Sequence, residues 1–348
     1  MKRRQFNKNI LMGLTSAAIP FSFNDNITFT DMNQKIKPQR LKVGDTVGLI
    51  TPSSSITETQ LEKAIKNMKS LGLKVKLGKH VRAINGYLAG TDKQRLEDLH
   101  TMFADKTVHG IWCIRGGYGV GRILPKINYQ LIRDNPKVLI GYSDITALLL
   151  AVYEQTGLVC FHGPVASSDF TDYSVRHLKG VLMEQHSIYP IYSAKENYDV
   201  KDSLYRIKVI RAGKAKGELT GGNLTLLAAM AGTPFRWDVK DKLVFMEDIG
   251  ERPYRVDRML TQVLQSTNLQ EAAGIILGIF EDCRAKRGNR SLSLMECLED
   301  RLGHLEIPII YGLSFGHIKH HFTIPIGIKG EMDTATQSLT QTEMGTKG

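Results

Sequence analysis

The segment from Val138 to Gln155 reads VLIGYSDITALLLAVYEQ. It begins with a short apolar run typical of a buried strand, passes through the polar turn Gly-Tyr-Ser-Asp, and continues as a segment that predicts a helix closed by Gly157. A strand that turns directly into a helix is the repeating unit of a parallel α/β sheet. The stretch therefore predicts an α/β fold with a polar turn at the carboxyl edge of a sheet.

The sequence before this stretch repeats the same alternation of strand and helix. Apolar runs over residues 46–50, 73–77 and 108–114 predict strands, and amphipathic spacing over 58–70 and 91–103 predicts the helices between them. Strands that alternate with helices in this way form a parallel sheet covered by helices. We therefore expect a doubly wound sheet of flavodoxin type.

The second half of the chain is richer in strands. The regular pattern weakens over residues 170–197, where polar residues accumulate, and this segment is the predicted junction between two domains. The elements predicted beyond it are strands at 204–210, 215–219, 243–246, 275–280, 309–310 and 322–328, and helices at 224–230, 255–264 and 293–302. The patterns together predict a signal segment and spacer over residues 1–30, a flavodoxin-like domain over 41–175, and a β-rich α/β domain over 198–340.

Composition sets the class of protein and excludes several others. Of 348 residues, 42% are hydrophobic and 23% are charged, which are the proportions of a globular protein rather than a disordered chain. No internal apolar run is long enough to span a bilayer, so we expect no stable membrane insertion. The four cysteines have no C-x-x-C spacing, which excludes a zinc ribbon and predicts four buried thiols. The net charge of +11 is dispersed and accompanies no recognition motif, so no nucleic-acid partner is expected.

The beginning of the chain has the features of an export signal. Adjacent Arg3 and Arg4 are followed by Phe6, Lys8 and a mildly apolar segment, an order that resembles a bacterial twin-arginine signal. Asn7 departs from that motif, which prefers Leu at this position. The signal predicts an exported, periplasmic protein, and the alternative is a basic disordered tail on a cytoplasmic protein.

The turn Gly141-Tyr142-Ser143-Asp144 is the first candidate for chemistry. A serine between a strand and a helix has its hydroxyl at the carboxyl edge of the sheet, beside the free N–H groups of the helix N-terminus. This is the physical arrangement of a nucleophile elbow, in which an oxyanion faces the N–H group of the following residue. Ile145 replaces the last glycine of the G-x-S-x-G motif, however, and the other interpretation of Ser143-Asp144 is an ordinary helix cap.

A second candidate is the glycine-rich turn RGGYGVG over residues 115–121. It follows a predicted strand and resembles a dinucleotide-binding turn, but Arg122 stands where close packing of helix against sheet requires Gly or Ala. A second interpretation is that the glycines let a backbone N–H group approach the same crevice as Ser143. A third is a tight turn without function.

Two further motifs carry titratable side chains beside predicted strands. Glu247 and Asp248 end one such strand, and the alternating charges that follow favour either catalysis or a salt-bridged helix start. His317 follows a glycine-bounded turn, where a lone histidine is either structural or catalytic. His320 and His321 lie nearby, but no carboxylate stands at ligand spacing, so no metal is expected.

Taken together and in this order, the motifs resemble the LD-carboxypeptidase family, which includes muramoyltetrapeptide carboxypeptidases and microcin-immunity peptidases. The blocks that carry the resemblance are RGGYG at 115–119, GYSD at 141–144, GGNL at 221–224, ED at 247–248 and GLSFGH at 312–317. The resemblance extends over nearly all of the chain beyond the signal segment. It implies a flavodoxin-like N-terminal domain, a swivelling β-rich C-terminal domain, and assembly as a homodimer.

The same resemblance implies roles for individual residues. Ser143 matches the nucleophile, Glu247 the acid and His317 the base of a serine peptidase that needs no cofactor and no metal. The oxyanion hole corresponds to the backbone N–H groups of Gly117 and Asp144. Motifs that line the substrate cleft contain, in this chain, Arg115, Tyr118 and Asn223.

The activity that the resemblance implies is hydrolysis of a murein tetrapeptide. We expect the enzyme to cut the amide between an L-centre of meso-diaminopimelate and terminal D-Ala through an acyl-enzyme. Two alternatives stay open at this point. One is hydrolysis of a different amide, in a peptide-nucleotide antibiotic, as in the immunity branch of the family. The other is a two-lobed ligand-binding protein without catalytic activity.

Overall fold

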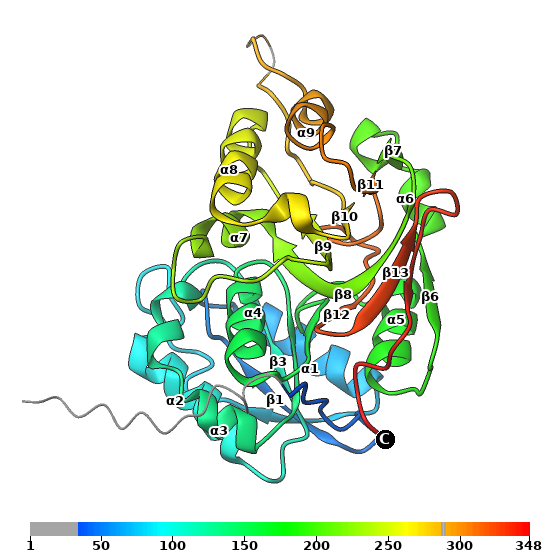
Figure 1. Ribbon diagram of the computed structural model, residues 1–348. Coiled ribbons are helices and arrows are strands. Elements are labelled where there is room, and N and C mark those ends of the chain that lie inside the picture. The colour runs from blue at the N-terminus through cyan, green and yellow to red at the C-terminus, as the bar shows by residue number, and fades with distance from the viewer. Residues whose placement is uncertain (1–33, 287, 289) are drawn as a thin grey trace, which may run out of the picture. The chain divides into compact units, whose positions relative to one another are not determined.

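The computed structural model describes residues 34–286, 288 and 290–348, so the predicted signal segment over residues 1–30 lies outside the described residues. Within them, the chain builds two sheets with helices packed around them (Figure 1). The first sheet has the strand order β12-β5-β4-β3-β1-β2, and the second has the order β6-β14-β13-β8-β9-β10-β11-β7. The predicted α/β class with two domains is confirmed.

The first sheet has the topology that the sequence pattern predicts. Its strands are β1 (Thr46–Ile50), β2 (Lys74–Leu77), β3 (Gly110–Cys113), β4 (Val138–Gly141), β5 (Cys160–His162) and β12 (Ile324–Ile326). Strands β1 to β5 are parallel, and their order 2-1-3-4-5 is that of flavodoxin. Strand β12 comes from the strand predicted at 322–328 but joins this first sheet, because it pairs antiparallel with β5.

The second sheet is larger and mixed in direction. Its strands are β6 (Tyr189–Tyr192), β7 (Lys208–Arg211), β8 (Lys214–Asn223), β9 (Lys242–Glu247), β10 (Gly274–Leu277), β11 (Ile309–Tyr311), β13 (Lys329–Asp333) and β14 (Ser338–Gln341). Strands β8 to β11 are parallel, whereas β13, β14 and β6 on one edge and β7 on the other run antiparallel to their neighbours. The strand predicted at 204–210 begins later, because residues 203–205 form a 3₁₀ turn.

The helices follow the amphipathic segments of the sequence. They are α1 (Glu58–Ser70), α2 (Asp92–Ala104), α3 (Tyr129–Asp134), α4 (Ile145–Thr156), α5 (Asp172–Leu182), α6 (Lys195–Tyr198), α7 (Leu224–Met230), α8 (Pro253–Ser266) and α9 (Leu294–Leu302). Helix α5 lies inside the segment predicted as a polar junction. It forms because Thr171 caps its first turn and one face, including Leu178 and Leu182, is buried while its other face stays polar.

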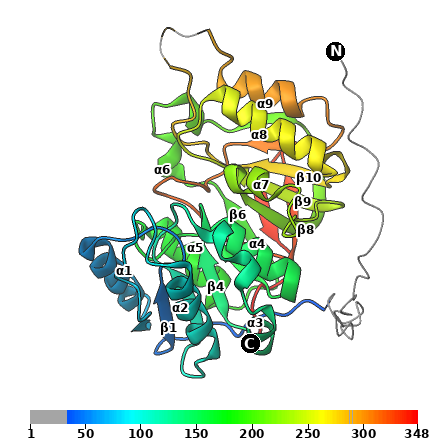
Figure 2. The same ribbon diagram turned by 90° about the vertical axis from the view of Figure 1, so that its left-hand side faces the viewer.

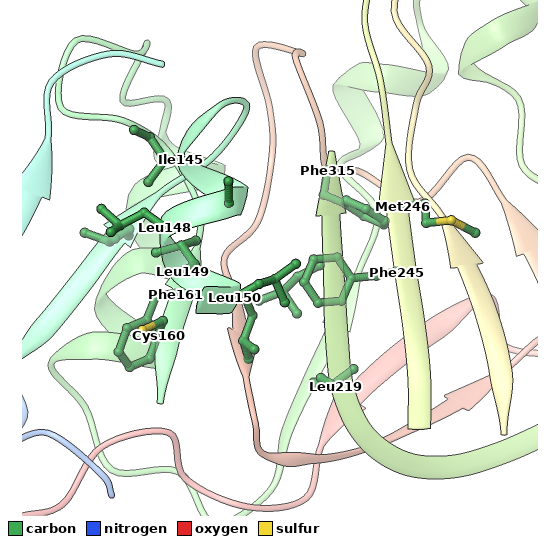
Figure 3. Packing of buried hydrophobic residues seen from close by; sticks show 14 of the residues in the cluster. Ile145, Leu148, Leu149, Leu150, Cys160, Phe161, Leu219, Phe245, Met246 and Phe315 are labelled. Atoms are coloured by element: carbon green, nitrogen blue, oxygen red, sulfur yellow. The ribbon is translucent and has the colours of Figure 1, made fainter. Parts of the chain in front are cut away.

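Helix α4 is the element that joins the two sheets. Every residue from Ile145 to Val152 is buried, and a helix that is apolar all round needs apolar partners on every side. Figure 3 shows Leu150 on the side of Phe245 and Leu219 of the second sheet, with Leu148 on the opposite side of the helix. In Figure 2, α4 lies between the upper elements β8 to β10 and the lower elements β1 and α2. Its first turn lies against both sheets, because it follows the end of β4 and Thr146 Oγ1 accepts a hydrogen bond from the N–H of Asn223 at the end of β8.

Two further expectations concern features outside the sheets. All four cysteines are free and buried, as the sequence predicts. Among the described residues, no helix is both long enough and apolar enough to cross a membrane.

Candidate active site

Ser143 lies on a sharp turn between β4 and α4. Its backbone has a φ of 64°, in the left-handed region that a residue with a side chain seldom occupies. Such a conformation persists only where the surroundings hold it, and it is frequent at active sites. Gly116 packs against the turn so closely that a Cβ at that position would lie 2.8 Å from the Cβ of Ser143. Ser143 therefore has the partly exposed, constrained setting of a nucleophile elbow.

The carboxylate of Asp144 does not cap α4, so the cap interpretation of the sequence is wrong for this side chain. It accepts hydrogen bonds from Ser53 Oγ at 2.5 Å and from the backbone N–H of Val120 at 3.0 Å, and it is almost completely buried. It thereby ties the glycine-rich loop to the helix start. Within the described residues, the backbone N–H groups of Asp144 and Gly117 donate no hydrogen bond, so both are available to a substrate oxygen.

The glycine-rich loop is held by serines that the sequence analysis does not single out. Ser54 Oγ accepts a hydrogen bond from the N–H of Tyr118 at 3.1 Å. A Cβ on Gly117, whose φ is 116°, would lie 2.3 Å from Ser54 Oγ, so only glycine fits. The signal for Ser53 and Ser54 was present, because they follow β1, and β1 is the sheet neighbour of the strand that precedes the loop.

Arg95 of α2 is a second residue that sequence reasoning missed. It is 1% exposed, and its Nη1 donates to the carbonyl oxygens of Pro52 at 2.6 Å and Gly119 at 2.8 Å. Asp92 accepts from its Nη2 at 2.6 Å and balances the charge. Arg95 thus clamps the loops that follow β1 and β3. No long helix follows the glycine-rich loop, since Val120–Arg122 form a 3₁₀ turn, which leaves no helix N-terminus for a dinucleotide phosphate.

Glu247 and His317 form a buried hydrogen-bonded pair. Glu247 ends β9, its side chain is fully buried, and its Oε2 lies 2.7 Å from Nδ1 of His317. Gly316 (φ 118°) lets the histidine loop approach, because a Cβ there would lie 3.1 Å from Glu247 Oε2. With Nδ1 bonded to the carboxylate, Nε2 of His317 is the nitrogen left to act as a base.

The electrostatics of this pair suit a base and its orienting acid. Burial lowers the pKa of His317, but the negative charge and hydrogen bond of Glu247 outweigh burial and leave the pKa above its ordinary value. Burial raises the pKa of Glu247, but the charge and hydrogen bond of His317 leave it below its ordinary value. Each partner therefore favours the charged form of the other.

Tyr142 brings the turn of Ser143 next to the Glu247–His317 pair. The rings of Tyr142 and His317 lie 4.7 Å apart between centroids, and Tyr142 immediately precedes Ser143. Ser143 and His317 share no hydrogen bond within the described residues. The bond from the N–H of Asn223 to Thr146 Oγ1, at 3.0 Å, also fixes the start of α4 against the end of β8.

The charged segment after Glu247 contains both arrangements that the sequence allowed. Asp248 is buried and accepts hydrogen bonds from Asn223, Ile249 and Thr225, and burial together with the charge of Glu247 raises its pKa to about 6. The salt-bridged helix start is formed further on, by Glu251 and Arg255 at 3.3 Å. The two adjacent acids therefore belong to the site rather than to the surface network.

The residues predicted to bind substrate lie in different settings. Tyr118 is 55% exposed and meets Tyr87 edge-on, with centroids 5.6 Å apart. Arg115 is exposed and donates from Nη1 to the carbonyl oxygen of Ser55 at 2.9 Å. Asn223, in contrast, is 3% exposed, and its Nδ2 donates to Asp248 Oδ1 at 3.1 Å. Tyr118 and Arg115 are thus exposed, whereas the side chain of Asn223 is buried against Asp248.

No cluster suited to a metal occurs among the described residues, where no three His, Cys, Asp or Glu side chains gather around a common point. His321 is buried, and burial lowers its pKa to about 3. Its ring lies 5.2 Å from that of Tyr142 between centroids, so it packs behind the site.

Comparison with known proteins points to one family. The family model described as the LD-carboxypeptidase N-terminal domain matches residues 47–163, and the LD-carboxypeptidase C-terminal domain matches residues 216–332. The chain is 42% identical over 302 residues to a probable murein peptide carboxypeptidase of Bacillus subtilis (strain 168), covering 87% of this chain and 93% of that protein. It is 35% identical to the murein tetrapeptide carboxypeptidase of Pseudomonas aeruginosa, covering 81% of this chain and 91% of the relative.

A solved structure supports the same conclusion. The microcin C7 self-immunity protein MccF, in an inactive mutant without ligand, has a TM-score of 0.80 and 25% identity with this chain, covering 89% of this chain and 99% of that one. The likeness therefore spans both sheets and the site between them.

Proposed function

This chain belongs to the LD-carboxypeptidase family and is a serine-type peptidase, and from that premise we propose that it cuts the amide between meso-diaminopimelate and terminal D-Ala of murein tetrapeptides. The observation that carries the proposal is the hydrogen bond of 2.7 Å from His317 to buried Glu247, beside the constrained turn of Ser143. Relatives named for murein peptides support the choice of substrate.

The proposed mechanism assigns one role to each member of the triad. His317 takes the proton of Ser143 Oγ through Nε2 while the oxygen attacks the scissile carbonyl. Glu247 accepts from Nδ1, holds the imidazole in this tautomer, and stabilises the cation that forms. The protonated His317 then gives its proton to the leaving amine of D-Ala. Water, deprotonated by His317, hydrolyses the acyl-enzyme and restores Ser143.

The oxyanion of each tetrahedral intermediate needs fixed donors. We assign this role to the backbone N–H groups of Gly117 and Asp144, which donate no hydrogen bond within the described residues. Each donor of this kind contributes roughly 2.7–4 kcal/mol to the barrier. The hydrogen bonds that Ser54 and Asp144 make with the glycine-rich loop keep these donors in place before substrate binds.

Recognition of the substrate is assigned to the predicted cleft residues. A carboxypeptidase must bind a free α-carboxylate, and Arg115 is an exposed cation in the loop that carries Gly117. Tyr118 offers an exposed ring for apolar contact with the peptide. The side-chain amide of Asn223 donates to Asp248, so it can bind substrate only if that hydrogen bond breaks. With the bond intact, Asn223 holds Asp248 in place.

A second candidate substrate is supported by the similarity to MccF. It is an amide that joins an amino acid to a nucleotide analogue, and the same triad would cut it. A panel of defined murein tetrapeptides and aminoacyl-sulfamoyl nucleotides, followed by mass spectrometry, separates the two. Release of D-Ala with intact nucleotide analogues supports the murein assignment, and the reverse pattern contradicts it.

The non-catalytic alternative is tested by covalent labelling. A fluorophosphonate reacts with an activated serine, so we expect one adduct on the wild-type protein that maps to Ser143. A protein that binds a murein peptide tightly, returns it unchanged and takes up no label would be a binding protein instead.

We also propose export by the twin-arginine route and assembly as a homodimer. Export is supported by Arg3 and Arg4 in their sequence context, which lies outside the described residues. A reporter fused to residues 1–30 should reach the periplasm and should stay in the cytoplasm when both arginines become lysine. Analytical ultracentrifugation of the protein without this segment tests the dimer, and a single monomeric species contradicts it.

A further inference from the structure

His162 is a buried histidine that the proposed mechanism does not use. It ends β5, directly beside β4, and the register places it opposite Gly141, two residues before Ser143. Its exposed fraction is 0%. The carboxyl ends of β4 and β5 thus carry the proposed nucleophile and this imidazole at one edge of the sheet.

The imidazole of His162 sits among aromatic rings. Centroid distances are 5.3 Å to Phe245, 6.1 Å to Tyr142 and 6.4 Å to Phe315. Neither ring nitrogen has a hydrogen-bond partner among the described residues. A neutral imidazole carries one N–H donor and one acceptor, and leaving a buried polar group unpaired is costly. A phenyl ring would fill the same volume without leaving polar atoms unpaired. The two nitrogens of His162 are therefore expected to have a hydrogen-bond partner.

A matching group lies on β9 of the second sheet. Oε1 of Glu247 is buried and has no hydrogen-bond partner among the described residues, while Oε2 binds His317. Phe245 and Glu247 are two positions apart on β9, so their side chains leave the same face, and Phe245 on that face meets His162. The charge of Glu247 also acts on His162, so the unpaired imidazole and the unpaired carboxylate oxygen lie near each other in the buried interior. Buried water commonly bridges such groups.

We propose that His162 is a positioning residue that donates a hydrogen bond, through one buried water, to Oε1 of Glu247 and so holds the carboxylate in line with His317. The inference rests on the proposed function only in taking Glu247 and His317 as the catalytic pair. Burial keeps His162 uncharged, with its pKa lowered to about 4, so at neutral pH it serves as a neutral donor. A carboxylate held through both oxygens cannot rotate away from the imidazole.

Replacing His162 is expected to lower the pKa of His317. A hydrogen-bond donor stabilises the carboxylate form of Glu247, and the carboxylate stabilises the imidazolium of His317. Without the donor both effects become smaller, so the pKa of His317 falls. The titratable groups that face His317 from the elements around it are Glu247 and Asp248 of β9 and its end, Glu281 after β10, His162 of β5, His321 of the following loop, and Tyr142 after β4. All but His162 are unchanged in the test variants.

The test compares His162→Phe, which keeps a ring without nitrogen, with His162→Gln, which restores a donor. For His162→Phe we expect the pKa of His317, followed by NMR without substrate, to fall by about half a unit or more. We expect kcat to fall about 10- to 100-fold with KM nearly unchanged, by analogy with groups that orient a metal-binding histidine. His162→Gln should recover most of both. His177→Phe, a buried histidine on α5, is the matched control and should change neither.

Three results would overturn the inference. The first is that His162→Phe keeps the pKa of His317 and the kcat of the wild type. The second is that His162→Gln loses as much kcat as His162→Phe. The third is that His177→Phe changes the pKa of His317 and kcat as much as His162→Phe does. If His162→Phe does not fold, a high-resolution crystal structure of the wild type decides, since it must show a water within hydrogen-bond distance of a His162 nitrogen and Glu247 Oε1. A wild type that cuts no murein peptide defeats the proposed function, yet the NMR titration still tests this inference.

Discussion

The imidazole of His317 shows how far one residue's chemistry depends on one neighbour. Burial alone lowers its pKa, and Glu247 reverses that direction. Only the unprotonated imidazole can accept the Ser143 proton, so activity rises as pH passes upward through a pKa above the ordinary value of about 6.5. The acidic limb of the pH–rate profile therefore reports the Glu247–His317 bond.

Replacing Glu247 with Gln tests this dependence. The amide carries no charge, so the pKa of His317 should fall and the acidic limb should move to lower pH. We expect kcat to fall by about 10⁴, as in other serine peptidases when the orienting acid becomes an amide. The measurement is the pH dependence of kcat/KM on one murein tetrapeptide. An acidic limb that stays in place, or moves to higher pH, would show that Glu247 does not control His317.

At the same scale, the sequence predicted some site residues and not others. Ser143, Glu247 and His317 stand in motifs at predicted strand ends, and the structure brings Glu247 and His317 into contact. Arg95 and His162 carry no motif. Their surroundings depend on which strands are sheet neighbours and on which loops meet, and neither is written in local sequence.

Among the elements, the glycine-rich loop is held in place by side chains from other parts of the chain. It is fixed by the Ser54 hydroxyl, by the Asp144 carboxylate and by the guanidinium of Arg95. Three contacts from three elements hold a loop that has little apolar surface of its own. The position of the Gly117 N–H group is therefore set by packing rather than by local propensity.

Substitution of Gly117 by Ala tests the loop. The positive φ and the short approach to Ser54 mean that the backbone must shift, and the N–H donor must shift with it. We expect a loss of about 10²- to 10³-fold in kcat. Gly121→Ala is the control in the same loop, because a Cβ there meets nothing within 4 Å. Equal activity of the two variants would show that Gly117 does not shape the oxyanion hole.

Element prediction failed where elements are short or have a polar outer face. Strand β5 spans only Cys160–His162, too few residues for an alternating pattern. Helix α5 lies in a segment that the sequence predicts as a junction, because the exposed face of the helix is polar. Helices α1 and α7, in contrast, have the bounds that the sequence predicts.

Across the whole molecule, buried neutral histidines link stability to pH. Burial lowers the pKa of His162 and His177 to about 4 and of His321 to about 3. Because the unfolded chain takes up these protons near pH 6.5 and the folded chain does not, stability falls as pH drops from about 6.5 to about 4. Each histidine contributes on the order of 3 kcal/mol to that loss.

The variant His177→Phe isolates one of these contributions without touching the site. It removes one proton that the unfolded state gains, so its free energy of unfolding should depend less steeply on pH between about 6.5 and 5 than that of the wild type. Urea denaturation at a series of pH values measures the slope. An equal or steeper slope would mean that His177 is not held neutral by the fold.

The fold class was accessible from sequence because parallel sheets are built from repeated strand–helix units, and the second sheet was recognised as β-rich. The exception is β12, which returns to the first sheet although its sequence neighbours belong to the second. Apolar composition says that a strand is buried but not which sheet buries it. The chain therefore crosses between the sheets more often than a simple division at residues 170–197 suggests.

The central claim is that Ser143 is the nucleophile of an LD-carboxypeptidase reaction. The most direct measurement is release of D-Ala from a defined murein tetrapeptide by the wild type and by Ser143→Ala, with circular dichroism to show that both are folded. We expect the wild type to release the terminal D-Ala and the folded Ser143→Ala variant to lose about 10⁶-fold in kcat. A folded Ser143→Ala protein that releases D-Ala at the wild-type rate would contradict it.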